Sequence, residues 1–414
     1  MGSIYENAYL TIAAASASNC TIGFLRRKDW VRKISTMHGE KCIIGYAYEP
    51  GERGHPMGPL HDRGWFYQEW LLSERILCFD VDEISWYCTI EQTCECGDHE
   101  SLRRHRVYEI ERRKIYRSMI SASQSEGNPN WYALVNGYVS KELTYPSDRL
   151  PAFTATAAAY HRATGDVYLA GLWKSDLLTG LSWYVNRRHP SNVNDISFDL
   201  NAAVPSWSWA SCGTQDRVYM FPGEVKFNGA RVIGIDYQPF SDNEFGSGKG
   251  TITLRGLVTP AFITNEGDHD TSSYALTPLT WARLIFYTKE QKWGSSDASG
   301  KFMPDCHLEP RECHFSDFAQ TGIDVTTVQR GGRPMLKANA VVLLLHLFDV
   351  FTQGPLIHHE VGYSTIRTRH VLVLAPSPST TRDNGIYQRI GMLQIEDNYQ
   401  WHFSEGKHMN VTIE

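Results

Sequence analysis

The sequence lacks the short motifs that mark several large classes of enzyme. No GxGxxG motif follows a predicted strand, and no GxxxxGK[ST], HExxH or GxSxG motif occurs anywhere. A dinucleotide-binding oxidoreductase, a P-loop nucleotidase, a zincin protease and an α/β-hydrolase therefore have no support. Internal repeats and low-complexity tracts are missing as well, which argues against a repeat protein.

The sequence also lacks a long uninterrupted apolar segment. The longest apolar run, residues 338–351, contains His346 and Asp349 and is too short to span a bilayer. The N-terminal residues have no basic region, and Glu6 and Asn7 stand where the apolar part of a signal peptide would begin. Glu6 also occupies the position at which a myristoylation signal has Ser or Thr. We therefore expect a soluble, cytoplasmic protein.

What the sequence has is length, aromatic residues and a small negative charge. Its 414 residues are 42% hydrophobic and 21% charged, which is typical of a globular protein with a large core. The net charge of -6 gives no general attraction to nucleic acid or to an anionic membrane. The 12 Trp, 21 Tyr and 17 Phe can stabilise a core or line an apolar pocket. Nine scattered Cys indicate reduced thiols.

The pattern of apolar residues predicts an α+β fold in two parts. Residues 1–200 should be helix-rich with a small sheet. Residues 201–414 should form an antiparallel, β-rich sandwich or barrel. Helices are expected at residues 1–8, 68–73, 100–121, 131–142 and 149–164. Strands are expected at 9–16, 75–80 and 83–88, and then at 218–221, 230–237, 250–258, 282–288, 340–348, 370–375 and 390–395.

Two groups of residues could bind metal or charge but carry weak signals. Cys88, Cys94, Cys96 and His99 are thiols and an imidazole close in sequence, yet their spacing matches no standard zinc site. We favour scattered thiols there and leave the metal open. The basic residues between 103 and 117 are interrupted by acidic ones, which favours a solvated helix face over a nucleic-acid contact.

The segment RGWFYQE, residues 63–69, combines polar and aromatic side chains. Arg63 and Glu69 can be neighbours where a turn enters a helix, Gln68 can hydrogen-bond beside them, and Trp65 can cover the group from water. A buried ion pair without hydrogen bonds costs on the order of several kcal/mol. Two interpretations stay open: a polar clasp that joins helix to sheet, or the wall of a functional pocket.

Several blocks of this sequence resemble successive blocks of the fungal HET (heterokaryon incompatibility) family. The blocks are MGSIYENAYLTIAAAS, PLHDRGWFYQEWLLSERILCF and ISWYC, followed by LTYPSDRLPAF, YLAGLW, PSWSWAS and GIYQRIGMLQI. The resemblance implies a role in cell death after fusion of unlike hyphae. It also implies a TIR-like, nucleotide-handling N-terminal half that lies upstream of the first block, and we expect this chain to lack it. Residues 1–200 would then be a HET-like remnant with a helical extension. The family motif falls on Arg63, Trp65, Gln68, Glu69, Leu72, Arg75, Trp86 and Cys88, and on Pro205, Trp207, Trp209 and Ser211.

Three hypotheses of function follow. The first is a HET-like scaffold repurposed as a cofactor-independent enzyme of secondary metabolism. It would fold an apolar terpenoid or polyene for cyclisation or cycloaddition, as a Diels–Alderase does. The catalytic candidates are His61, Arg63, Tyr67 and Glu69, of which His61 or Tyr67 would polarise a carbonyl. The substrate-binding candidates are Trp65, Gln68, Trp86, Trp173, Trp207 and Trp209.

The second hypothesis is an effector or regulator of fungal cell death. The third is a binding protein that pairs with a second copy or with a full-length HET partner through an exposed sheet edge. The sequence names no metal and no cofactor for any of the three.

Overall fold

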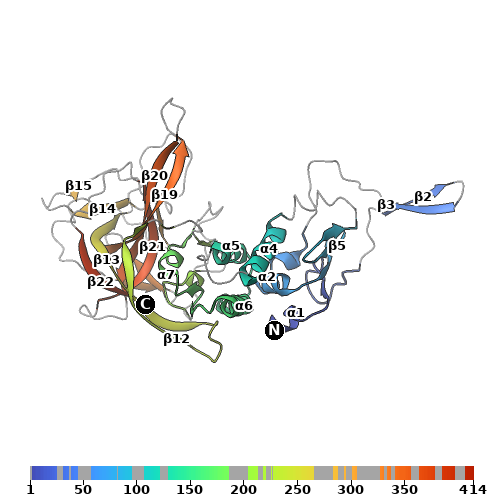
Figure 1. Cartoon of the computed structure of the whole chain (residues 1–414), viewed down its shortest axis with the longest axis horizontal. Coiled ribbons are helices and arrows are strands. Elements are labelled where there is room, and N and C mark those ends of the chain that lie inside the picture. Colours follow the sequence, from blue (N-terminus) through green and yellow to red (C-terminus); the bar gives the residue numbers. More distant parts are fainter. Residues whose placement is uncertain are drawn as a thin grey trace. The chain divides into compact units, whose positions relative to one another are not determined.

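The computed structural model describes residues 2–25, 31–36, 39–44, 57–81, 83–95, 107–121, 129–185, 204–212, 218–220, 225, 227–264, 283–287, 293–294, 301–304, 327–330, 333–336, 341–355, 363–377, 385–396 and 406–414 (Figure 1). The chain divides into two compact units. The first comprises Met1–Glu126 with Ala133–Gly165, and the second Gly127–Tyr132 with Asp166–Glu414. The predicted boundary near residue 200 lies outside the described residues.

The first unit contains a small sheet and several helices. Its four-stranded sheet has the order β1 (Thr11–Ala13), β4 (Ile76–Phe79), β5 (Ile84–Tyr87) and β6 (Gln92–Cys94), with β1 parallel to β4 and the other pairs antiparallel. β2 (Val31–Thr36) and β3 (Gly39–Ile44) form a separate antiparallel pair. The helical elements are α1 (Gly2–Glu6), η1 (Pro59–Asp62), α2 (Gly64–Leu72), α4 (Val107–Ser121), η2 (Pro146–Asp148), η3 (Pro151–Phe153) and α6 (Thr154–Thr164). α5 (Pro129–Tyr138) begins in the second unit and ends in the first.

Alternation along the strands places one face of this sheet in the core. Ile76 and Cys78 on β4, and Ser85 and Tyr87 on β5, are buried, while the residues between them are partly exposed. Phe66 and Trp70 of α2 pack in the same apolar cluster. α2 is buried on nearly all sides, so its residues must find their polar partners inside the unit.

The second unit begins with short elements and continues into a large sheet. The short elements are β7 (Tyr168–Leu169), β8 (Leu172–Trp173), α7 (Leu177–Gly180), β9 (Tyr184–Val185), η5 (Trp209–Ser211) and β10 (Val218–Tyr219). The large sheet has ten strands: β11 (Phe227–Asn228), β12 (Ala230–Pro239), β13 (Gly248–Thr264), β14 (Arg283–Tyr287), β15 (Trp293–Gly294), β16 (Lys301–Pro304), β19 (Val341–Pro355), β20 (Tyr363–Pro376), β21 (Ile386–Glu396) and β22 (Lys407–Ile413). β17 (Thr327–Arg330) and β18 (Arg333–Leu336) pair separately.

The large sheet closes on itself through its longest strand. β13 pairs with β22 through residues 252–258 and with β19 through residues 258–262. β19, β20, β21 and β22 pair in turn, and the long antiparallel pair β19–β20 is visible in Figure 1. Five strands therefore form a closed ring of hydrogen-bonded neighbours, in which only β21 and β22 are parallel. The predicted α+β class is confirmed, and the β-rich part takes the barrel-like form.

The helices of the described residues are short or polar. None of them is long and apolar enough to cross a membrane.

Candidate functional site

The RGWFYQE segment starts α2, and a distant loop fixes that start. The backbone N–H of Gly64 donates to the carbonyl of Glu142 (2.7 Å), and the N–H of Glu142 donates to Asp62 (2.6 Å). A side chain at position 64 would collide with Leu143, since its Cβ would lie 2.6 Å from Cδ2. The side chain of Arg63 is exposed beside this junction.

The other polar groups of the segment bond to backbone or side chains of the same unit. The Tyr67 hydroxyl donates to the Leu134 carbonyl (3.0 Å), and burial holds the pKa of Tyr67 far above its usual range. Gln68 Oε1 accepts from the Ala155 N–H (3.1 Å). Trp65 Nε1 donates to Asp148 (3.2 Å). These contacts are those of a clasp, while the catalytic role of Tyr67 and the substrate contacts of Trp65 and Gln68 stay predictions.

Glu69 pairs with a residue that the sequence analysis passed over. Its carboxylate is partly buried and hydrogen-bonds the Tyr5 hydroxyl. Burial raises the pKa of Glu69, and the Tyr5 bond and the charge of Arg63 only partly offset the rise. Within the described structure Arg63 and Glu69 form no ion pair. Burial and the charge of Glu69 raise the pKa of Tyr5 to about 12.

The prediction of a solvent-exposed basic helix face is wrong for Arg113. The basic run on α4 was predicted to face solvent, but Arg113 is 6% exposed. Its guanidinium donates to the carbonyls of Trp70 (3.1 Å), Ser73 (2.8 Å) and Glu74 (3.2 Å), so it closes the C-terminal end of α2. Burial lowers its pKa to about 10. No local pattern marks it, because its partners lie about 40 residues away.

The candidate tryptophans of the second unit are core residues. Trp173, Trp207 and Trp209 have no exposed surface. Trp209 Nε1 donates to the Gly171 carbonyl (2.9 Å), and Trp207 Nε1 donates to Gly250 (3.3 Å). Such bonds let an indole be buried without loss of its N–H partner. These three residues lie in a different unit from Trp65, His61 and the rest of the α2 segment.

Trp86 and the two described cysteines of the weak metal candidate lie in the small sheet. Trp86 is partly exposed on β5 and hydrogen-bonds the Cys88 sulfur. Burial raises the pKa of the Cys88 thiol, but bonds from the backbone of Glu91 and Ile90 and from Trp86 bring it below its usual range. Cys94 is buried in the apolar cluster. Cys96 and His99 lie outside the described residues.

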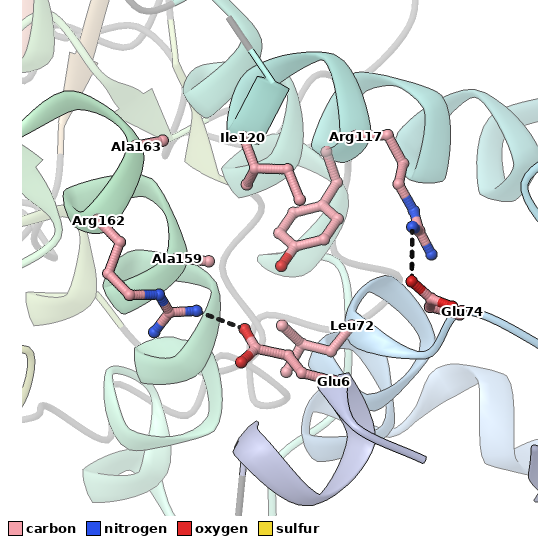
Figure 2. A pocket seen from close by; sticks show the side chains of 9 residues that line it. Glu6, Leu72, Glu74, Arg117, Ile120, Ala159, Arg162 and Ala163 are labelled. Carbon is pink, nitrogen blue, oxygen red and sulfur yellow. Dashed lines mark hydrogen bonds and ion pairs between the residues drawn. The ribbon is translucent and has the colours of Figure 1, made fainter. Parts of the chain in front are cut away.

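A cavity of about 330 Å³ lies between α1, the end of α2, α4 and α6 (Figure 2). Its wall is formed by Glu6, Leu72, Glu74, Tyr116, Arg117, Ile120, Ala159, Arg162 and Ala163. Arg162 reaches Glu6 (2.6 Å) on one side, and Arg117 lies 4.0 Å from Glu74 on the other. The site is thus an apolar floor with two charged pairs at its sides, and its volume is at the lower end of that of small-molecule sites.

Tyr116 is the buried polar residue of this cavity. It is 2% exposed, and burial together with the charge of Glu6 holds its pKa far above its usual range, while Arg162 and Arg117 act in the opposite direction. Its hydroxyl is therefore neutral at physiological pH and can donate a hydrogen bond. Tyr116 was not among the predicted site residues, because a Tyr within a polar helix carries no distinguishing pattern.

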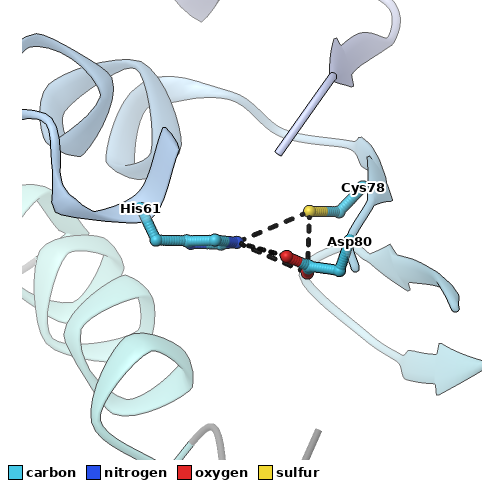
Figure 3. Close-up of side chains that lie close together, drawn as sticks. All are labelled: His61, Cys78 and Asp80. Carbon is cyan, nitrogen blue, oxygen red and sulfur yellow. Dashed lines mark hydrogen bonds and ion pairs between the residues drawn. The ribbon is translucent and has the colours of Figure 1, made fainter. Parts of the chain in front are cut away.

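His61, the remaining catalytic candidate, is buried and meets Cys78 and Asp80 (Figure 3). These three are the group of metal-ligating side chains that the described residues bring within 4.8 Å of one another.

Comparisons with known proteins found no match to this chain. No family model, no curated protein and no solved structure matches the chain. The resemblance to the HET family therefore rests on the sequence blocks quoted above and stays a prediction.

Proposed function

We propose that the protein is a cofactor-independent enzyme of secondary metabolism that binds its apolar substrate in the cavity around Tyr116. The observation that carries the proposal is a cavity of about 330 Å³ whose wall combines Leu72, Ile120 and Ala159 with the buried side chain of Tyr116. The proposed site therefore differs from the one predicted in the α2 segment, whose polar groups hydrogen-bond to other residues of the first unit.

The chemistry of the cavity fits a molecule with an apolar body and one carbonyl group. Leu72, Ile120 and Ala159 would contact the hydrocarbon part, and Tyr116 would donate to the carbonyl oxygen. The donated bond strengthens as negative charge develops on that oxygen during cyclisation or cycloaddition. Confinement of a flexible polyene in a reactive shape would supply the remaining rate enhancement.

A binding experiment with the dye 8-anilinonaphthalene-1-sulfonate tests the site. This probe has an apolar aromatic body and an anionic group that Arg162 or Arg117 can attract. Ala159→Phe should fill the cavity and abolish the fluorescence gain, because Ala159 is buried in its wall. Ala158→Phe is the matched control on the same helix, since Ala158 is not part of the wall. Equal dye binding by the two variants would refute the site.

A kinetic experiment tests the chemistry. A synthetic linear trienone, which holds a diene and a conjugated carbonyl in one chain, should cyclise faster and with an enantiomeric excess in the presence of the protein. Tyr116→Phe should lower the rate by about 100-fold, which is the usual effect of losing one donor to a developing oxyanion. A racemic product at the uncatalysed rate, with dye displacement proving that the trienone is bound, would contradict the proposal.

The second candidate function is a regulator of fungal cell death of the HET kind. It is favoured by the observation that Tyr67, Gln68 and Trp65, which belong to a block of the resemblance, all hydrogen-bond within the first unit, as scaffold residues would. Expression in growing hyphae, scored with a vital dye, separates the two candidates. Death that persists in Ala159→Phe and Tyr116→Phe would favour the regulator.

A further inference from the structure

A buried triad of His61, Cys78 and Asp80 lies where η1 meets the end of β4 (Figure 3). The three side chains come from a 3-10 turn, from a strand and from the residue that follows that strand. Their residues are 4%, 0% and 2% exposed. An imidazole, a thiol and a carboxylate are the three donor types that proteins use for zinc.

The distances between the donor atoms are those of a tetrahedral metal site. His61 Nε2 lies 3.7 Å from Cys78 Sγ and 3.4 Å from Asp80 Oδ2, and Sγ lies 3.2 Å from Oδ2. Zinc bonds of ordinary length at tetrahedral angles place N and S about 3.6 Å apart, N and O about 3.3 Å apart, and S and O about 3.5 Å apart. Each observed distance agrees with its counterpart to within about 0.3 Å.

We propose that His61, Cys78 and Asp80 bind one divalent transition-metal ion of the zinc type. A thiolate and a carboxylate would neutralise the two charges of the ion. The fourth position of the tetrahedron is left to a water molecule, as in other sites with three protein ligands.

The surroundings of the triad hold these donors in place. The N–H of Gly58 donates to Asp80 Oδ1 (2.9 Å), which also lies 3.2 Å from His61 Nε2, while Oδ2 meets both the imidazole and the thiol. Any larger residue at position 58 would place its Cβ 1.9 Å from the Ala15 carbonyl oxygen, so this approach requires glycine. The rings of Phe66 and Trp70 meet the imidazole edge-on at 5.4 and 5.5 Å and fix its plane. Groups that orient the ligand side chains in this way are typical of metal sites.

A buried hydroxyl next to the triad has no hydrogen-bond partner within the described residues. Ser85 pairs with Cys78 across β4 and β5, is 1% exposed, and its Oγ has no hydrogen-bond partner within the described structure. A thiolate bound to a metal accepts hydrogen bonds more strongly than a neutral thiol does. Ser85 is the cross-strand neighbour of Cys78 and is buried like it, so its hydroxyl is a donor that the sheet provides on the side of the thiol. The ion would tie η1, and hence the start of α2, to the small sheet.

Cobalt substitution in the full-length protein tests the proposal. The protein is stripped with a chelator, Co²⁺ is added, and the thiolate-to-cobalt charge-transfer band is recorded together with the visible bands that report four-coordinate geometry. Wild type should take up one Co²⁺ per chain with both signals. Cys78→Ala should lose the charge-transfer band and bind Zn²⁺ at least about 100-fold more weakly. Cys94→Ala is the control, because Cys94 is a buried thiol of the same cluster.

The outcomes separate the triad from the other candidate site. A band that is lost in Cys94→Ala but kept in Cys78→Ala would overturn the proposal and assign the metal to the group around Cys88 and Cys94. The absence of any charge-transfer band in folded wild type would also overturn it, and the triad would then be a hydrogen-bonded joint. If Cys78→Ala does not fold, Asp80→Asn, which keeps the thiol and the shape of the side chain, should shift the visible bands and weaken Zn²⁺ binding.

Discussion

Replacement of Arg113 by Met tests whether one buried arginine closes α2. The guanidinium donates three hydrogen bonds to carbonyls at the end of that helix and lies over the ring of Trp70, 5.4 Å from its centre. A bond to a charged group contributes about 1.5–3 kcal/mol, and a buried carbonyl left without a donor costs about 1–3 kcal/mol. Methionine would cover Trp70 and remove the cost of burying the charge, which offsets part of the loss. We expect a net destabilisation of about 3 kcal/mol.

Urea unfolding, followed by tryptophan fluorescence and far-ultraviolet circular dichroism, measures this loss as a shift in the transition of the first unit. Arg117→Met is the matched control. Arg117 lies one turn further along α4 and donates one long bond (3.3 Å) to the Ser73 carbonyl. It should cost less than about 1 kcal/mol because it is partly solvated. Equal losses in the two variants, or an Arg113→Met transition within about 0.5 kcal/mol of wild type, would refute the reasoning.

Three further predictions concern single positions. Gly171→Ala should lower the free energy of unfolding by at least about 3 kcal/mol, because φ is +95° and the new Cβ would lie 2.5 Å from Nε1 of Trp209. Gly385→Ala, with φ of +58° and open space around it, should lower it by about 1 kcal/mol, and thermal unfolding measures both. Burial lowers the pKa of His370 to about 4, so only the unfolded chain takes up its proton between pH 6.5 and pH 4. Stability should therefore fall as the pH drops from 7 to 5, by about 2 kcal/mol more in wild type than in His370→Gln, and equal losses would contradict the assignment. Tyr67→Phe should cost about 1 kcal/mol through the lost bond to Leu134 and leave dye binding unchanged, whereas a loss of dye binding would restore Tyr67 as a candidate for the site.

The spacing and the length of the apolar runs predicted the longer helices and strands from the sequence. The run HVLVLA lies within β20, and Val371, Leu372 and Val373 are all fully buried, which is the reason the run is continuous and does not alternate. α2 was predicted to start at Gln68 but starts at Gly64. The four extra residues are helical because the backbone just before them hydrogen-bonds to Glu142. Glu142 is distant in sequence, so the residues around position 64 do not reveal this contact.

The closed ring of strands was only partly predictable for a similar reason. Four of the five ring strands, β13, β19, β20 and β21, contain runs that the sequence predicts, whereas β22 was not predicted. An antiparallel, barrel-like arrangement follows from several such strands joined by polar linkers. The ring itself depends on β13, which is long enough to pair with β22 along one part and with β19 along the next. The sequence shows a strand there but not its change of partner.

The segment from Pro59 to Phe79 shows why residue type could not separate a clasp from a catalytic site. A helix buried on nearly all sides needs side chains that hydrogen-bond to backbone groups far away in the sequence. The same types of side chain also bind substrates in active sites. The deciding information is the partner, and the partner of Gln68 is 87 residues away while that of Tyr67 is 67 residues away. The triad is the converse case, because His61 and Asp80 are 19 residues apart and match no known spacing. Only the packing of His61 against the end of β4 places the three side chains around one point, so metal-ligand geometry can arise in a sequence that shows none of its motifs.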